Sequence, residues 1–593
     1  MKGKTILKII LWFLAVVVLV LGITFAIGYF YYAKIVRTYL TEMVQKESKG
    51  LYKAEIGDLY LNLLGGNLTI DRFSLLPDTA LYRARAGTDT VSPLLIKLTI
   101  NQFRIRGFHV MAALKERKID VTRIRFIGPE VTVFRMKMPP KTDEGKNKET
   151  LMSIPLPKGL SSILVKEFMI EDAKLEFVDC TKDTITRNTF PTCNIFIRHI
   201  LVDSAHTGKK RLFNADDISI TLGSYALPMK NGMNEISFGE IGLSTATGEV
   251  YAKNFHLKPL FSKYDYSRKL GFQTDWMDIR INKVIFKRMD LRKLLFEGKM
   301  KAGLLEIDTL TLDDYRDKRV DLKPGFKPPM PQQAIRNLKS YLRIDTILLK
   351  NGKASYAEQV GEVPGTIFFD KLNATFTGLT NDSLLLHAGL VSELKGSGYL
   401  MGQGRLDVTV RFNFADKQNS FSFSAMLGPF DLTIINPMLS NLVPAKVLGG
   451  KVKRVFIPMV YANDDVARGK MLFYYNDLKV SMVDQEQTTW SKVKKGVINF
   501  AANDLLLSND NPNKAGKMHT AVIFAERKKE LGFVNYFWRS AFSGIKSTIG
   551  FNSKDQKSMI KEEKKIKKEE AKEERKIKKE QAKEEKKKNR KQK

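Results

Sequence analysis

Alternation of apolar and polar residues is the feature that most constrains the fold of this chain. It is clearest in the stretches LYLNLLGGNLTI and RLDVTVRFNF. The apolar positions of these stretches share one face of each strand: Leu61, Leu63, Leu68, Ile70, Leu406, Val408, Val410, Phe412 and Phe414. A period of two residues is typical of β-strands that are apolar on one face and polar on the other. The sequence therefore predicts a mainly β protein.

An internal repeat indicates how these strands are arranged. Leu98–Arg135 aligns without gaps on Ile279–Arg316, so that Leu114 falls on Leu295 and Lys118 on Lys299. Each copy predicts a strand, a short helix and a second strand. Further short helices are predicted in QQAIRNLKSYLR and TIINPMLSNLV. Units of this kind stack side by side, so we expect an elongated sheet rather than separate round domains.

The N-terminus contains an uncharged segment, Ile9–Phe30. As a helix this segment would be about 33 Å long, which is enough to cross a bilayer. Lys2, Lys4 and Lys8 precede it, and positive charge before a first span favours a cytoplasmic N-terminus. A cleaved signal peptide is the alternative, but the apolar run is longer than a typical signal-peptide core. We predict a single-pass anchor within residues 1–36, with the body of the chain outside the cytoplasm.

Two regions resemble the AsmA-like family of envelope proteins, within the AsmA/TamB group. The first is IGDLYLNLLGGNLTIDRFSLLPD together with the Leu98–Arg135 unit that follows it. The second is Leu427–Asp484, where the pattern G-x-M-x-x-x-Y-x-D-L runs from Gly469 to Leu478. The resemblance implies an inner-membrane-anchored periplasmic protein that acts in outer-membrane homeostasis and lipid movement. It also implies a β-sheet curled lengthwise into a trough, with family regions at 37–330 and 331–526.

On this interpretation, the nine apolar positions given above line a groove for acyl chains. The ligand is then a phospholipid or another envelope lipid, and no cofactor is needed. Shielding a lipid tail from water stabilises it by about 0.8 kcal/mol per methylene. The alternative is a structural or regulatory scaffold that buries the same face in a closed core. The two hypotheses differ in whether apolar side chains line an accessible face.

Enzymatic activity is not predicted. The chain has no GxSxG, P-loop or HExxH motif, and its Gly-rich segment Gly396–Gly404 precedes a strand. The 6 histidines lie far apart, without the spacing of metal ligands. We therefore assign no catalytic, cofactor-binding or metal-binding residues.

The two cysteines, Cys180 and Cys193, flank the turn-rich segment TKDTITRNTFPT. An oxidising compartment would let them close a short loop. We predict a disulfide between them, with free thiols as the alternative.

The C-terminal region predicts two further elements. Residues 527–551 form an amphipathic helix that either covers the open end of the sheet or lies in a membrane interface. Its candidate membrane contacts are Phe533, Phe537, Trp538, Phe542 and Ile545. Residues 552–593, rich in Lys and Glu, predict a charged helical or disordered tail. Partners of this end would be a second membrane surface or an envelope protein.

The net charge of the chain is +34. The tail has 19 basic and 10 acidic residues, which leaves +25 on the rest of the chain. Such a charge suits anionic headgroups or other envelope polyanions. No nucleic-acid recognition motif is present, so nucleic acid is not a predicted partner.

Overall fold

The computed structural model describes residues 32–62, 65–85, 92, 94–136, 159–181, 185–203, 214–442, 445–482, 509–549 and 552–562, with scattered positions up to 579. The predicted anchor at Ile9–Phe30 and the candidate groove residue Leu63 lie outside these ranges. Within them, no helix has the length and apolar character needed to span a membrane.

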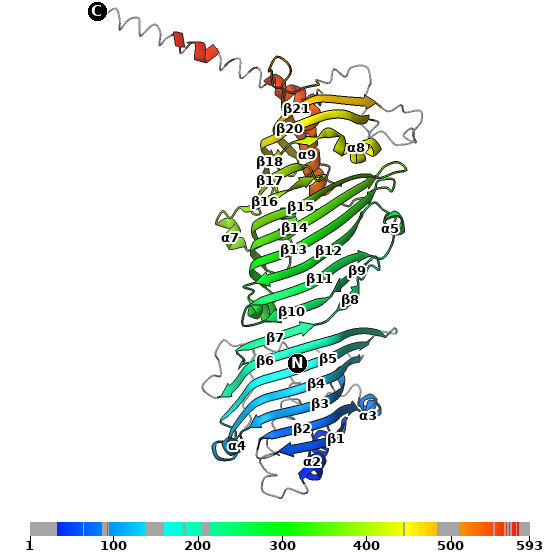
Figure 1. Cartoon of the computed structure of the whole chain (residues 1–593), viewed down its shortest axis with the longest axis vertical. Helices are drawn as coiled ribbons and strands as arrows, with labels where there is room; N and C mark the ends of the chain where they lie inside the picture. The colour runs from blue at the N-terminus through cyan, green and yellow to red at the C-terminus, as the bar shows by residue number, and fades with distance from the viewer. Residues whose placement is uncertain are drawn as a thin grey trace, which may run out of the picture. The chain divides into compact units, whose positions relative to one another are not determined.

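The described chain is mainly β, as predicted, and most neighbouring strands are antiparallel. It divides into two compact units. The first comprises Met1–Lys258 and Arg280–Glu306, and the second Pro259–Ile279 and Ile307–Lys593. Figure 1 shows how the strands of each unit run side by side.

In the first unit, helix α2 (Tyr32–Glu47) precedes a sheet in which strands pair in the order β1–β2–β3–β4–β5–β6–β7–β10–β11. Strands β4 and β5 are parallel, whereas the other pairs in this series are antiparallel. The strands are β1 (Tyr52–Asn62), β2 (Asn67–Pro77), β3 (Leu94–Phe108), β4 (Lys118–Met136), β5 (Ser162–Cys180), β6 (Thr186–Asp203), β7 (Asp217–Leu222), β8 (Tyr225–Pro228), β9 (Asn234–Phe238), β10 (Glu240–Ser244) and β11 (Glu249–Pro259). The short helices α3 (Thr79–Ala84) and α4 (Val110–Glu116) connect strands.

In the second unit, the antiparallel order is β14–β15–β16–β17–β18–β20–β21–β22. These strands are β14 (Leu342–Gln359), β15 (Gly365–Thr380), β16 (Ser392–Leu400), β17 (Gly404–Phe412), β18 (Phe421–Leu427), β20 (Ala445–Ala462), β21 (Val466–Met482) and β22 (Thr520–Glu526), with the short β19 (Phe430–Asp431) beside β20. The helices are α5 (Lys263–Leu270), α6 (Pro331–Arg336), α7 (Ser383–His387), η4 (Leu432–Ile435), α8 (Asn436–Leu442) and α9 (Phe533–Thr548). The four short helices predicted within the body are therefore confirmed, as α4, α6, α8 and the helical turn η3 (Lys293–Glu297).

The repeat predicted from the sequence is confirmed in the backbone. Helix α4 joins β3 to β4, and the helical turn η3 (Lys293–Glu297) joins β12 (Asp275–Lys287) to β13 (Met300–Asp317). Left-handed residues recur at matching positions: Gly107, Arg117 and Gly128 in the first copy, Arg288, Gly298 and Thr309 in the second. The two copies therefore share these left-handed positions as well as their strands.

The predicted disulfide is not formed, because Cys180 and Cys193 are free thiols. Both lie on the β5–β6 hairpin, but its register pairs Cys193 with Ala173. Cys180 lies further along β5, about 23 Å from Ala173 at 3.3 Å per residue, whereas a disulfide requires Cα atoms within about 7 Å. Dithiothreitol is therefore expected to leave the melting temperature unchanged in a thermal scan. A fall of several degrees on reduction would contradict this register.

Candidate functional site

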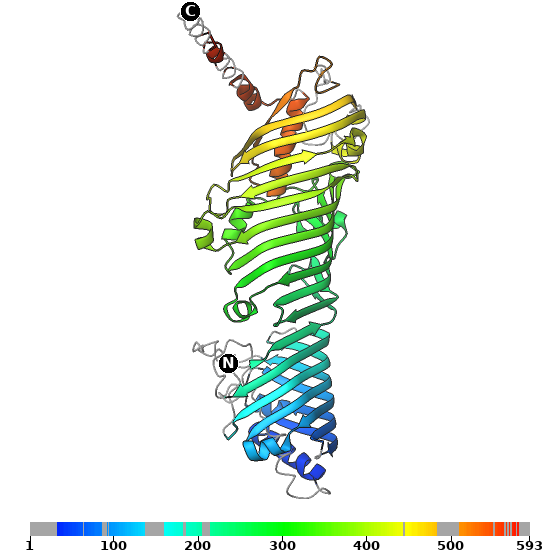
Figure 2. The ribbon, with the colours of Figure 1, turned by 60° about the vertical axis from the view of Figure 1, so that its left-hand side comes forward.

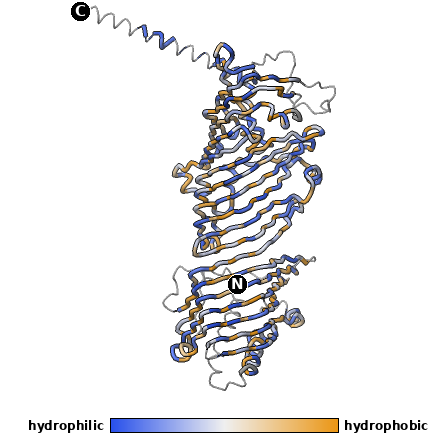
Figure 3. The backbone as a smooth tube through the Cα atoms, viewed as in Figure 1, coloured by the Kyte–Doolittle hydropathy of each residue, from blue (hydrophilic) through white to orange (hydrophobic). Residues whose placement is uncertain are grey.

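A continuous line of apolar side chains crosses the sheet of the first unit, one from each of nine neighbouring strands. We call it the first ladder: Leu59, Ile70, Phe103, Phe126, Ile170, Ile195, Ile220, Leu243 and Val250. Each member is the direct register partner of the next. A second line beside it contains Leu61, Leu68, Ile105, Ile124, Phe168, Ile197 and Ile218. One face of this sheet is therefore apolar across its width, and Figure 3 shows the alternation along each strand that produces it.

The first ladder is closed at one end. Helix α2 places Val36, Leu40 and Val44 in the same core cluster as the ladder residues of β1 to β4, all of which are buried. From β5 onward, the ladder residues Ile170, Ile195, Ile220, Leu243 and Val250 are half-buried. In the part of the chain that the structure describes, no helix packs substantially on β5, β6, β7, β10 or β11. Described helices therefore cover this part of the ladder least, although Ile170 still packs against the α2 cluster and Val250 packs against Met289, Leu291 and Ala302.

The opposite face of the same strands is charged. Arg123 on β4 pairs with Glu167 on β5 at 2.5 Å, and Arg125 pairs with Glu171 at 2.5 Å. Ion pairs on an exposed sheet face contribute little stability, about 0–1 kcal/mol each, but they keep that face hydrated. The two faces thus differ sharply in polarity, as the alternating sequence predicts.

The second unit carries its own apolar line, the second ladder: Ile347, Phe376, Leu394, Val410, Phe423, Val460, Gly469 and Ile523. Its first three residues, on β14 to β16, are half-buried. Val410, Phe423, Val460 and Ile523 are buried in a core cluster that includes residues of α9. The second ladder is therefore fully buried beneath α9 (Figure 2) and half-buried on β14 to β16, where Phe376 and Leu394 pack against the margin of the same core and α8 contacts β14 and β15.

Helix α9 covers the end of the second sheet, which is one of the two roles predicted for it. Phe533, Phe537 and Ile545 pack against the core, and the ring of Phe537 lies 4.5 Å from that of Phe423. These three candidate membrane contacts are therefore occupied within the protein. The other two, Trp538 and Phe542, are 44% and 43% exposed. Trp538 stacks on Phe369 at 5.8 Å.

The same helix supplies hydrogen-bond partners to the backbone groups on the free edge of β22. The hydroxyl of Ser547 accepts a hydrogen bond from the backbone N–H of Val522 at 3.1 Å, and that of Ser543 accepts one from Phe524 at 3.1 Å. The Gln556 amide donates to the Val522 carbonyl at 2.7 Å. An unpaired strand edge invites association with other chains. Small hydroxyl residues on α9 therefore allow the helix to lie close to this edge, and their hydrogen bonds end the sheet at β22.

The structure separates the predicted groove residues into two groups. Leu68 and Ile70 are buried beneath α2, and Val410, Phe412 and Phe414 are buried in the α9 core. These five positions are closed core, so the prediction that they line an open groove is wrong. Helices distant in sequence cover them, which strand alternation alone does not reveal. Leu61, Leu406 and Val408 are half-buried on the apolar faces.

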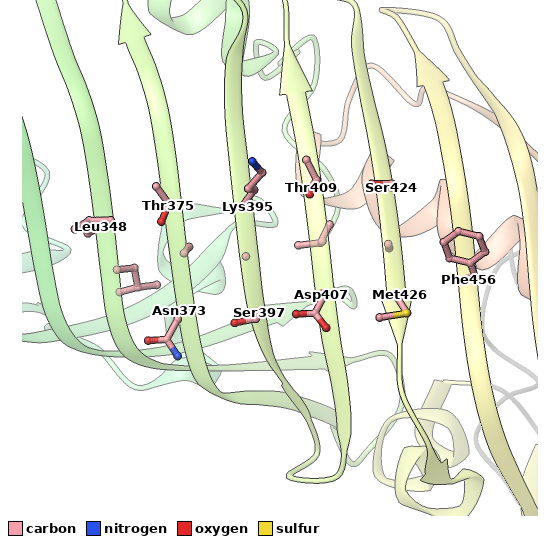
Figure 4. Close-up of a pocket in the computed structure, with 15 residues that line it drawn as sticks. Leu348, Asn373, Thr375, Lys395, Ser397, Asp407, Thr409, Ser424, Met426 and Phe456 are labelled. Atoms are coloured by element: carbon pink, nitrogen blue, oxygen red, sulfur yellow. The ribbon is translucent and has the colours of Figure 1, made fainter.

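A shallow depression of about 540 Å³ lies on the other face of β14 to β20. Its floor is formed where Ala374, Gly396 and Ala425 leave the backbone thinly covered. Figure 4 shows polar side chains around it, among them Thr375, Lys395 and Ser424, with α9 behind the strands. The lining of this open depression is mixed, because Leu348, Met426 and Phe456 lie beside the polar side chains.

A charged network lies where β12, β13 and β14 begin or end in the second unit. Arg316 forms a bidentate pair with Asp275 at 2.5 Å, and Tyr356 donates to Glu358 at 2.7 Å. Asp314 belongs to the same network, and its Oδ1 atom is buried without a hydrogen-bond partner. Burial, together with the nearby charge of Asp275, raises the pKa of Asp314 to about 7. This carboxyl group therefore titrates near neutral pH.

Among the described residues, no group of three His, Cys, Asp or Glu side chains is arranged as metal ligands would be. No protein-family model matches the chain, and no curated protein matches it either.

Sequence reasoning missed the half-buried part of the first ladder. In NIFIRHILV, Ile195 and Ile197 alternate with residues of the opposite face of the strand. In DISITL, Ile218, Ile220 and Leu222 alternate with polar residues. The signal was present in these short strands. What the sequence does not show is the register that aligns them with the ladder residues of β1 to β4.

Proposed function

We propose that this protein binds lipid, with acyl chains lying along the half-buried part of the apolar face of its sheet. The observation that supports the proposal is the continuity of the first ladder, which offers an apolar side chain from each of β5, β6, β7, β10 and β11. Fully burying an aliphatic side chain stabilises a protein or complex by about 1.5–3 kcal/mol. A line of half-buried apolar side chains therefore favours an apolar ligand, which would complete their burial. The resemblance to AsmA-like proteins extends the proposal to lipid conduction in a periplasmic, inner-membrane-anchored protein.

A scaffold without lipid is the second candidate. The observation that favours it is the closure of both ladders beneath helices, α2 in the first unit and α9 in the second. A scaffold requires no ligand on the stretch from β5 to β11. The two functions therefore make opposite predictions for that stretch.

Two adjacent register pairs on β5 and β6 provide a matched test. Ile170 pairs with Ile195 on the apolar face, whereas Met169 pairs with Phe196 on the other face. Chains from Tyr32 to Glu562, which keep α2 and α9, would be purified without detergent. Phospholipid per chain would then be measured by mass spectrometry.

The double variant I170N/I195N is expected to retain about tenfold less phospholipid than the parent, because two apolar contacts are lost. The control M169N/F196N is expected to retain the parental amount. Circular dichroism of both variants checks that the sheet is intact. Lipid-free parent protein that also refuses added phospholipid would favour the scaffold.

A further inference from the structure

The outer face of the second unit is the face opposite to its ladder. Along a single line of register partners, this face changes from paired charges to aromatic and basic residues. This line runs through Glu393, Arg411, Ser422, Tyr461, Arg468 and Phe524. On β16 and β17 the cations are neutralised, since Arg411 pairs with Glu393 at 2.8 Å and Arg405 with Asp407 at 3.2 Å. From β20 to β22 the line continues with aromatic and basic residues and contains no carboxylate.

The arginines of β20 and β21 stack on aromatic rings. The guanidinium of Arg454 lies 5.0 Å from the ring centre of Tyr474 and 5.8 Å from that of Phe456. The guanidinium of Arg468 lies 5.8 Å from Phe524. Both arginines are exposed, and neither has an ion pair with any residue that the structure describes. Stacking holds a guanidinium in place while its N–H edge stays available for a phosphate.

An anionic bilayer matches this surface better than free phosphate does. Tyr461, the register partner of Arg468, is 69% exposed, and exposed aromatic rings are typical of residues at the headgroup level of membranes. Lys470 adds a further exposed cation on the same face of β21. Each basic residue near an anionic membrane surface contributes to binding, and several together are sufficient to anchor a protein there.

We infer that the outer face of β20 to β22 docks on an anionic membrane surface, with Arg454 and Arg468 contacting lipid phosphates and Tyr461 lying among the headgroups. This surface lies on the opposite side of the strands from the second ladder. The inference does not depend on lipid binding along the ladders, and failure of either leaves the other standing.

The test uses the full-length chain in nanodiscs of phosphatidylcholine, mixed with vesicles of phosphatidylcholine and phosphatidylglycerol. The variant R454Q/R468Q is compared with R405Q/R411Q, which removes the same charge from the ion-paired half of the same face. Both proteins keep the basic tail, so its contribution cancels. We expect R454Q/R468Q to weaken vesicle binding by about 10- to 30-fold. The control is expected to weaken binding less than about threefold.

Equal losses in the two variants would show an effect of net charge alone and would overturn the docking site. If inorganic phosphate at constant ionic strength released the protein from the vesicles, the arginines would be binding sites for free phosphate, and membrane docking would be contradicted. Binding of single-stranded DNA that requires these arginines, without vesicle binding, would likewise contradict membrane docking. As an independent readout, the emission of Tyr461→Trp is expected to shift to the blue on anionic vesicles and to stay unchanged on phosphatidylcholine.

Discussion

The double variant S543A/S547A is expected to lose about 2–6 kcal/mol of local stability at β22. Both hydroxyl groups accept hydrogen bonds from backbone N–H groups of this edge strand, at 3.1 Å. Removing an acceptor leaves a buried donor unsatisfied, which costs about 1–3 kcal/mol each time. Hydrogen exchange of the β22 peptide Thr520–Glu526 measures the effect directly. We expect its amides to exchange on the order of 100-fold faster.

Ser540→Ala is the matched control, because Ser540 is equally buried on α9 but donates its hydroxyl to the Tyr536 carbonyl within the helix. Its β22 amides are expected to exchange as in the parent. The exposed edge of S543A/S547A is also expected to promote association between chains. Unchanged exchange in the double variant would mean that α9 does not terminate this edge.

Asp314→Asn is expected to stabilise the second unit by about 4 kcal/mol at pH 8. The pKa of Asp314 is raised to about 7 in the folded protein, against about 3.9 for an unfolded aspartate. Between these values the folded state binds more protons than the unfolded state, so stability falls as pH rises from about 4 to about 7. The neutral amide abolishes this loss. The gain is therefore complete above pH 7 and absent near pH 4.

Urea denaturation at pH 5 and pH 8 measures this difference. The control is Asp313→Asn, which neutralises the preceding carboxylate, directed to the other face of β13 by strand alternation. Its effect is expected to be the same at both pH values. If the parent and D314N lose stability equally between pH 5 and pH 8, Asp314 is not the group that titrates.

The sequence predicts the strands well because their alternation is long and regular. RLDVTVRFNF becomes β17 and the residues just after it. The two repeat copies share the position of their helix, their left-handed residues and an ion pair, Glu116–Lys118 at 2.7 Å and Glu297–Lys299 at 2.8 Å. These features are local. Local spacing determines them, so a single sequence is sufficient to predict them.

Coverage of the sheet could not be predicted in the same way. Val410 and Ile195 occupy equivalent apolar positions in their strands, yet Val410 is buried in the α9 core and Ile195 is only half-buried. The difference depends on where a helix more than a hundred residues away comes to lie. For α9, both a capping role and a membrane role were consistent with its amphipathic pattern. Its buried serines, which bond to β22, distinguish them only once the packing is known.

Site-specific photo-crosslinking at residue 195 tests the central claim most directly. A benzophenone amino acid would replace Ile195 in one variant and Phe196 in another, in full-length protein irradiated in membranes or intact cells. The two positions are adjacent on β6 but face opposite sides of the sheet. We predict a phospholipid adduct at residue 195 and none at residue 196, detected by mass spectrometry of the β6 peptide. Adducts at both positions, or at neither, would contradict lipid binding on the first ladder.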